Sequence, residues 1–182
     1  LATYLVDAVK DNDCVVATGT YEDPYTGRTI QFRQGEGDLI DIDHVVAMGN
    51  SWVTGAFAWH IKKRAAFAND PLNLLPADSG ANRQKGDGDA ATWLPPNKQF
   101  RCSYVARQIT VKTKYGLWVT APERAAFERV LADCPDESLV EDTWQAPIRV
   151  DHNIVDPGAP TPTPAPPSAP PSKQAPVPLM SV

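Results

Sequence analysis

The chain has 182 residues, of which 42% are hydrophobic and 21% are charged, a composition typical of a soluble globular protein with one domain and a tail. No apolar run approaches the roughly 18 residues that a membrane-spanning helix needs, which excludes a transmembrane protein. The net charge of −5 at first argues against a protein that binds nucleic acid.

The charge is, however, distributed unevenly. Residues 61–114 hold ten Lys or Arg against four Asp or Glu, whereas the rest of the chain holds seven against eighteen. A basic centre between acidic ends can bind a polyanion locally, and a solvated charged face explains the same numbers equally well.

The first half of the chain predicts one helix and three strands. Residues 1–10 carry apolar side chains at helical spacing and predict a short helix. Residues 14–32 predict two strands around the turn DPYTGR at 23–28, where proline and glycine suit a hairpin. Residues 39–46, LIDIDHVV, alternate well enough to predict a third strand.

The second half predicts helices around one further strand. Residues 54–70 predict a helix, 72–77 a short strand, and 78–87 a helix that opens on two good capping residues, Asp and Ser. A longer helix is predicted over 102–116, and another over 120–134 with a capping box at its start. Helices and strands mix without a repeating βαβ order, so the fold class is α+β.

The tail and the cysteines bear on domain organisation and location. Residues 151–182 are dense in proline and predict a disordered linker or tail beyond a folded domain at 1–150. Cys102 and Cys134 each lie near one end of a helical region, so a disulfide is plausible in an oxidising compartment, and three free thiols in a cytosolic protein remain the alternative. Cys14 has no assigned partner. Because the chain begins at Leu1 without a signal-like stretch, we expect a processed or trimmed product, and prior removal of an export signal is one explanation.

Two polar segments carry the candidate chemistry. In DIDHVV, at 41–46, an Asp-His pair lies on a strand, and in DPLNLLPADSGANRQKGD, at 70–87, one asparagine lies beside a second strand and another lies on the next helix. His44, Asn73 and Asn82, the last nine residues after the second, resemble the His-Asn-His/Asn set of HNH endonucleases. The likeness extends over roughly residues 15–134 and is greatest to a subfamily of bacterial, often secreted, HNH nucleases.

The resemblance implies a fold, a mechanism and a site. It implies a ββα-metal core at about 38–90, with additional helices and an N-terminal β-hairpin. His44 would be the general base that activates water, and Asn73 would orient the loop that holds it. Asp43 and Asn82 would bind a divalent metal, with Mg²⁺ expected first and Mn²⁺ also suitable. Arg83 and Lys85 would contact substrate phosphates.

The expected function is therefore metal-dependent hydrolysis of phosphodiester bonds in DNA, double-stranded by expectation, by a secreted or cell-surface bacterial protein. The alternatives are a non-catalytic nucleic-acid-binding module and a cell-surface interaction module that keep the fold. Each site residue also has a plain structural interpretation: His44 as a hydrogen-bonded strand residue, Asn73 as a turn residue, and Asn82 as a solvated helix position. Three aromatic side chains are expected in the core rather than on a base-stacking surface, namely Trp52, Trp59 and Trp93.

Overall fold

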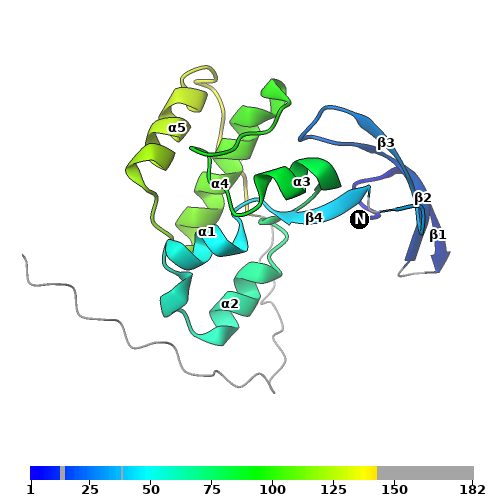
Figure 1. Cartoon of the computed structure of the whole chain (residues 1–182), viewed down its shortest axis with the longest axis horizontal. Helices are drawn as coiled ribbons and strands as arrows, with labels where there is room; N and C mark the ends of the chain where they lie inside the picture. The colour runs from blue at the N-terminus through cyan, green and yellow to red at the C-terminus, as the bar shows by residue number, and fades with distance from the viewer. Residues whose placement is uncertain (13–14, 38, 143–182) are drawn as a thin grey trace, which may run out of the picture.

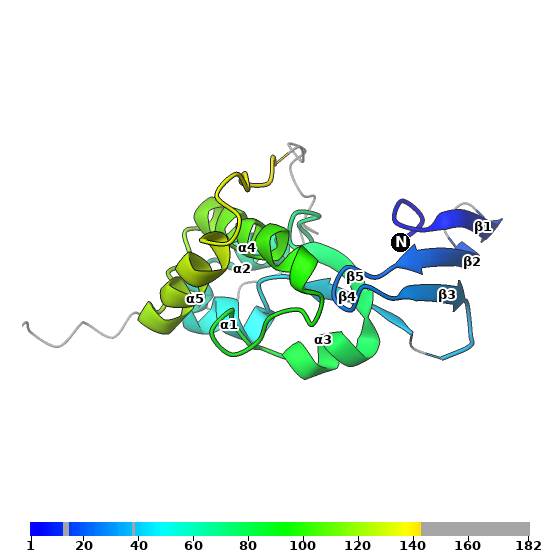
Figure 2. The same ribbon diagram turned by 90° about the horizontal axis from the view of Figure 1, so that it is seen from above.

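A computed structural model of the chain describes residues 1–12, 15–37 and 39–142, and it has a mixed α/β architecture with two small sheets and five α-helices in this part of the chain. A three-stranded N-terminal sheet lies at one side of the molecule and the helices lie at the other (Figure 1). A short β-hairpin lies between them, and Figure 2 shows it from above.

The N-terminal sheet contains β1 (Val6–Asn12), β2 (Val15–Glu22) and β3 (Thr29–Arg33), all antiparallel. The expected β2–β3 hairpin is confirmed, with its turn at 23–28. The helix expected over 1–10 is wrong, because the chain from Val6 onward forms β1 and pairs with β2 instead. Val6 and Val9 are 57% and 56% exposed, so their spacing marks no buried helix face. Pairing along a neighbouring strand here overrides the local periodicity.

The central hairpin pairs β4 (Ile40–His44) with β5 (Leu74–Asp78), and α3 (Ser79–Lys85) follows directly. The strands are antiparallel, and their register places His44 opposite Leu74. The Asp78 side chain caps α3 by accepting a hydrogen bond from the Ala81 amide at 2.8 Å, as its place before the helix predicts. Both strands and this helix are therefore confirmed, and together they form the hairpin–helix unit (β4, β5 and α3).

An insertion of three short helices joins the two hairpin strands: α1 (Met48–Val53), the 3₁₀ turn η1 (Ala56–Ala58) and α2 (Ile61–Ala68). The sequence predicted one helix over 54–70. It is interrupted because Gly55 has a φ of 134°, which only glycine adopts readily, and because His60 caps a new helix.

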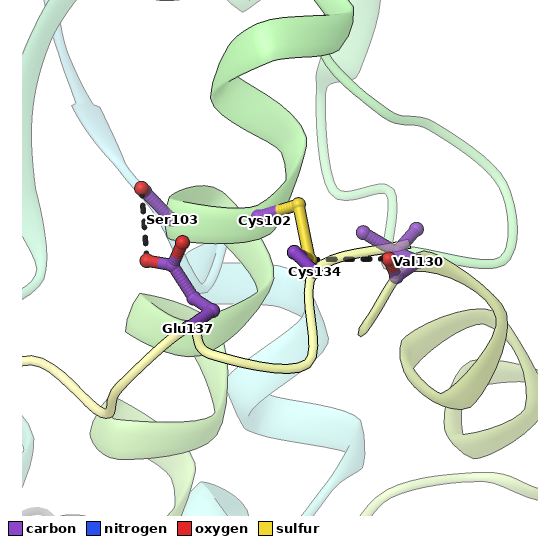
Figure 3. The surroundings of a disulfide bond; sticks show 5 residues. All are labelled: Cys102, Ser103, Val130, Cys134 and Glu137. Carbon is purple, nitrogen blue, oxygen red and sulfur yellow. Dashed lines mark hydrogen bonds between the residues drawn. A yellow bond between two sulfur atoms is a disulfide. The ribbon is translucent and has the colours of Figure 1, made fainter. Parts of the chain in front are cut away.

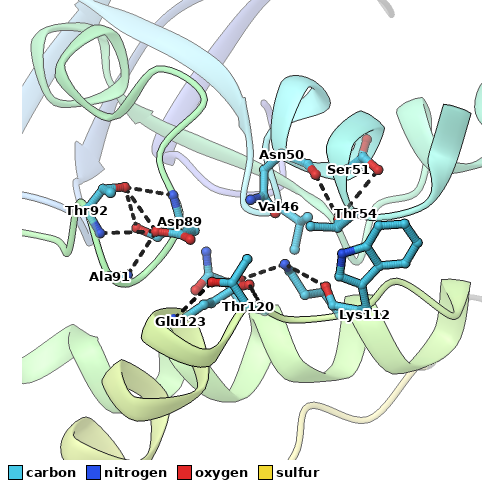
Figure 4. Close-up of polar contacts among 12 residues, drawn as sticks. Val46, Asn50, Ser51, Thr54, Asp89, Ala91, Thr92, Lys112, Thr120 and Glu123 are labelled. Carbon is cyan, nitrogen blue, oxygen red and sulfur yellow. Dashed lines mark hydrogen bonds and ion pairs between the residues drawn. The ribbon is translucent and has the colours of Figure 1, made fainter. Parts of the chain in front are cut away.

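Two longer helices complete the body, α4 (Arg101–Tyr115) after the turn η2 (Lys98–Phe100), and α5 (Ala121–Leu131). Gly116 ends α4 in the left-handed conformation, and Thr120 opens α5 with the expected capping box. The Glu123 of that box also forms an ion pair with Lys112 at 2.6 Å, and both side chains are buried between the two helices (Figure 4). The same carboxylate thus caps α5 and ties it to α4.

The predicted disulfide is confirmed between Cys102, at the start of α4, and Cys134, just beyond α5 (Figure 3). Its Cα atoms are 6.4 Å apart, and Ser103 donates a 3.0 Å hydrogen bond to Glu137 beside it. Cys14 and the proline-rich segment 151–182 lie outside the described residues.

The core consists of two clusters of buried side chains. One surrounds Tyr25 and Tyr104 beneath the hairpin–helix unit, and the other surrounds Phe67 and Tyr115 between α2 and α4. Trp59 is buried and Trp93 is partly buried, as expected, but Trp52 is 45% exposed, with the Arg64 guanidinium over its ring. The core position expected for Trp52 is therefore wrong. No helix of the described residues is long and apolar enough to cross a membrane.

Candidate active site

His44 stands at the end of β4, half-buried, with its ring nearly parallel to that of Phe67. Its Nε2 lies 2.8 Å from the backbone oxygen of Ala68, at the end of α2. A carbonyl oxygen only accepts, so Nε2 must carry the hydrogen, and in the neutral ring Nδ1 is left as the basic atom. The helix thereby fixes both the ring's orientation and the nitrogen that can take a proton.

Asn73 fixes the backbone directly after His44. Its Oδ1 accepts from the Val46 amide at 2.8 Å, its Nδ2 donates to the Val46 oxygen at 3.2 Å, and its own carbonyl accepts from the Val45 amide at 2.8 Å. The side chain is completely buried. Asn73 thus joins the chain just before β5 to the backbone after His44, and its side chain is not open to solvent.

Three side chains that the sequence did not indicate hold the two segments that meet at Asn73, namely residues 45–46 and residues 70–74. Arg107 of α4 donates to the backbone oxygens of Leu72, Pro71 and Leu74, at 2.7 to 3.2 Å. Gln108 donates to the Val45 oxygen at 3.0 Å. Asp70 accepts from the Leu72 amide, from the Tyr115 hydroxyl and from the Lys114 ammonium. In the sequence these three residues are marked only as polar side chains that lie on the inward face of a helix or at its end.

The charge of Asp70 is stabilised within this network. Burial alone raises the pKa of its carboxyl group, but hydrogen bonds from Lys114, Tyr115 and the Leu72 amide, together with the Lys114 charge, lower it further than burial raises it. The net pKa lies below the ordinary value of 3.8. The loop that carries Asn73 therefore rests on an ionised carboxylate.

Asp43, expected as a metal ligand, is buried and fully engaged. One carboxylate oxygen accepts from the Lys85 ammonium at 2.9 Å, and the other accepts from the Tyr25 hydroxyl. A divalent cation bound directly to Asp43 would lie roughly 5 Å from that ammonium, which costs about 7 kcal/mol of repulsion at an effective dielectric constant near 20. The donor set at Asp43 therefore does not fit a metal ion while this pair is closed.

Lys85, expected at the substrate phosphate, is instead enclosed by the protein. Its side chain is 0% exposed, and besides Asp43 it donates to the backbone oxygen of His44 at 2.8 Å. Its neighbour Arg83 has the opposite character, since its side chain is 62% exposed. Of this pair, only Arg83 is exposed to solvent.

Asn82 and Asp41 lie together on the exposed side of the hairpin–helix unit. The Asn82 amide donates to Asp41 at 3.1 Å, and Arg83 is 4.0 Å from the same oxygen. The Asp41 side chain is 29% exposed. Asp41 precedes His44 by three residues, which is about 10 Å along a strand. The side-chain oxygens of Asp41 and Asn82 therefore lie at a different point along β4 from the His44 imidazole. Among the described residues, no three His, Cys, Asp or Glu side chains form a group that would hold a metal ion.

Most of the basic centre noted in the sequence is used inside the fold. Seven of its ten basic side chains bind backbone oxygens or buried carboxylates: Lys63, Arg64, Lys85, Arg101, Arg107, Lys112 and Lys114. The other three are exposed, namely Lys62, Arg83 and Lys98. Most of the local excess of positive charge is therefore used in hydrogen bonds and ion pairs inside the protein and does not form a binding surface.

These features define a small mixed α/β domain, in which a hairpin–helix unit presents a histidine and a buried asparagine fixes the following loop. More particularly, the chain belongs to the family described as GmrSD restriction endonucleases, C-terminal domain, which residues 5–130 match. Membership of this family indicates a nuclease-related role.

One relative of the chain is a fungal protein. The chain is 36% identical over 126 residues to a protein of the fungus Arthroderma benhamiae described as an uncharacterized secreted protein. The match covers 68% of this chain and 60% of that protein's length. The relative is secreted, in line with the expectation of export, but its fungal origin gives no support to the expected bacterial source. No solved structure matches the chain.

Proposed function

We propose that this domain hydrolyses phosphodiester bonds of DNA, with the Nδ1 atom of His44 as the general base. The observation that carries the proposal is the 2.8 Å contact between His44 Nε2 and the Ala68 oxygen, which leaves Nδ1 as the basic nitrogen. A neutral imidazole held in one tautomer can take a proton from a water molecule as that water attacks phosphorus.

The other residues have supporting roles in this proposal. Asn73 holds the Val45–Val46 backbone so that the imidazole keeps its direction. Arg83, exposed on α3, offers a guanidinium to a phosphate of the substrate backbone. Asn82 and Asp41 offer oxygen atoms on the same side of the unit.

A divalent cation such as Mg²⁺ would supply charge neutralisation for the phosphorane-like transition state. Asn82 and Asp41 carry the exposed oxygen atoms of the unit, with Arg83 4.0 Å from the Asp41 oxygen. Asp41 lies about 10 Å along β4 from His44, so an ion held there would offset the charge of the neighbouring substrate backbone. Asp43, the ligand expected from the sequence, would take part only after its pair with Lys85 separates.

The proposal is tested by nicking of supercoiled plasmid. Wild type, His44→Ala and His60→Ala are compared with Mg²⁺, with Mn²⁺ and with EDTA. His60 is a matched control because it is an exposed cap of α2. Loss of a general base lowers the rate by about 10²- to 10⁴-fold, so we expect His44→Ala to be nearly inactive and His60→Ala to cut. Nicking that survives both His44→Ala and EDTA would refute the proposal.

A second candidate is a nucleic-acid-binding module without catalysis. It is favoured by one observation, the closed pair between Asp43 and Lys85, which withholds from a metal ion the carboxylate next to the histidine. In that case wild type would bind duplex DNA but leave plasmid intact with every metal tested. Such binding would weaken steeply with salt, because phosphate contacts release counterions.

A further inference from the structure

Lys85 is an unusual lysine, and the proposed chemistry above does not use it. Its ammonium group is fully buried beneath the end of β4, where it makes two charge-assisted hydrogen bonds. Lysine is seldom buried without a reason, because removing an ammonium from water is costly unless partners replace the water. The role of Lys85 therefore depends on the two groups that its ammonium contacts.

Both partners belong to the pair of residues at the centre of the site. The first is the carboxylate of Asp43, and the second is the backbone oxygen of His44, at 2.8 Å. Asp43 is held in turn by the hydroxyl of Tyr25, whose ring packs edge-on against Tyr104 in the core. The ammonium thus connects the last turn of α3 to the backbone that carries the imidazole.

The backbone of His44 is fixed on its other side as well. The peptide group that begins at the His44 oxygen ends at the Val45 amide, and that amide donates to the Asn73 oxygen. Lys85 and Asn73 therefore hold the two ends of one peptide group, and Ala68 holds the ring. A shift of about 1 Å in such a group is enough to cost roughly 10²-fold in rate.

We propose that Lys85 is a positioning residue, which holds the His44 peptide group through its ammonium and does not contact the substrate. This inference rests on the proposed function, since it concerns the same reaction. It reverses the role expected from the sequence, in which Lys85 and Arg83 contact phosphate together. The structure assigns the phosphate contact to Arg83 alone, which is exposed, and the internal contact to Lys85.

The first test uses Lys85→Met and Arg83→Gln as a matched pair. For each variant kcat and KM are measured on a DNA duplex, and duplex binding is measured by fluorescence anisotropy over a range of salt concentrations in a His44→Ala background. We expect Lys85→Met to lower kcat about 10²-fold with an unchanged KM and an unchanged salt dependence. Arg83→Gln should raise KM and make the log–log salt slope shallower by about 0.9, the value of one lost phosphate contact. A shallower slope for Lys85→Met would overturn the assignment.

Lys85→Met alone can fail to fold, because it leaves the Asp43 carboxylate buried without its cation. The double variant Asp43→Leu/Lys85→Met removes both charges, and an apolar pair is often as stable as the ion pair that it replaces. A merely structural role predicts that kcat in this folded variant recovers to that of Asp43→Asn, which lacks the carboxylate but keeps Lys85. Positioning predicts that kcat stays low, because nothing donates to the His44 oxygen. Recovery of kcat would therefore contradict the proposal.

A spectroscopic readout separates this inference from the proposed function. The ¹⁵N signals of the His44 ring and of the Val45 amide are recorded in wild type and in the double variant. We expect both sets to shift or broaden in the double variant, and those of His60 to stay in place. If His44→Ala abolishes cleavage but these signals do not change, positioning by Lys85 is wrong while the proposed function stands. If His44→Ala still cleaves, the proposed function fails whatever the spectra show.

Discussion

Removing the Asn73 side chain is the sharpest test of how the site is supported. In Asn73→Ala the Val46 amide and the Val46 oxygen each lose a partner, and both lie in a part of the chain that is shielded from water. A buried polar group left without a partner costs about 1–3 kcal/mol. Two such groups give an expected loss of roughly 4 kcal/mol in the free energy of unfolding.

The assay is urea denaturation of Asn73→Ala beside Asn69→Ala. Asn69 is a suitable control because its amide also donates to a backbone oxygen, that of Ala65 at 2.9 Å, but from an exposed helix end. Water replaces that bond, so Asn69→Ala should cost less than about 1 kcal/mol. Losses within 1 kcal/mol of each other in the two variants would refute the claim that Asn73 is the internal support of the loop after His44.

Three further results are expected. Reducing the disulfide between Cys102 and Cys134, which closes a 32-residue separation, should lower the free energy of unfolding by about 4 kcal/mol, as measured by denaturation with and without reductant. The pKa of Asp70 is lower in the folded than in the unfolded protein, so the stability that its carboxylate contributes is full above about pH 4 and is lost as the pH falls through the folded pKa. Asp70→Asn should therefore be less stable than wild type at neutral pH, and its stability should depend less on pH in acid. Urea midpoints that fall with acid as steeply in Asp70→Asn as in wild type would count against this. Burial first, and then neighbouring groups, raise the pKa values of Tyr25 and Tyr104 well above 10. The free energy of unfolding should therefore fall as the pH rises beyond 10, the pKa of these tyrosines in the unfolded chain. Ultraviolet titration should show these rings ionising only as the protein unfolds.

The sequence predicted those elements whose signals are local. The α5 capping box, the glycine that ends α4 and the aspartate that caps α3 are each specified by two or three neighbouring residues, and each appears where the pattern placed it. β1 was missed because its strand conformation depends on pairing with β2, which no local pattern in residues 1–10 encodes.

For the site, spacing indicated which residues belong together but not which of them face outward. Arg83 and Lys85 are two positions apart on one short helix and look equivalent as sequence letters, yet one is exposed and the other is buried against Asp43. A helix turns about 200° over two residues, so the two side chains point in nearly opposite directions. Arg107 and Gln108 were not identified at all, because they reach the loop from a helix more than 30 residues away.

The central claim, that the His44 imidazole takes a proton from the attacking water, is tested most directly by chemical rescue. His44→Gly leaves a space beside Phe67 and the Ala68 oxygen that free imidazole can enter. We expect that His44→Gly does not nick plasmid by itself and regains activity as the imidazole concentration rises, whereas His60→Gly needs no imidazole. Nicking by His44→Gly at the wild-type rate without added imidazole would contradict it.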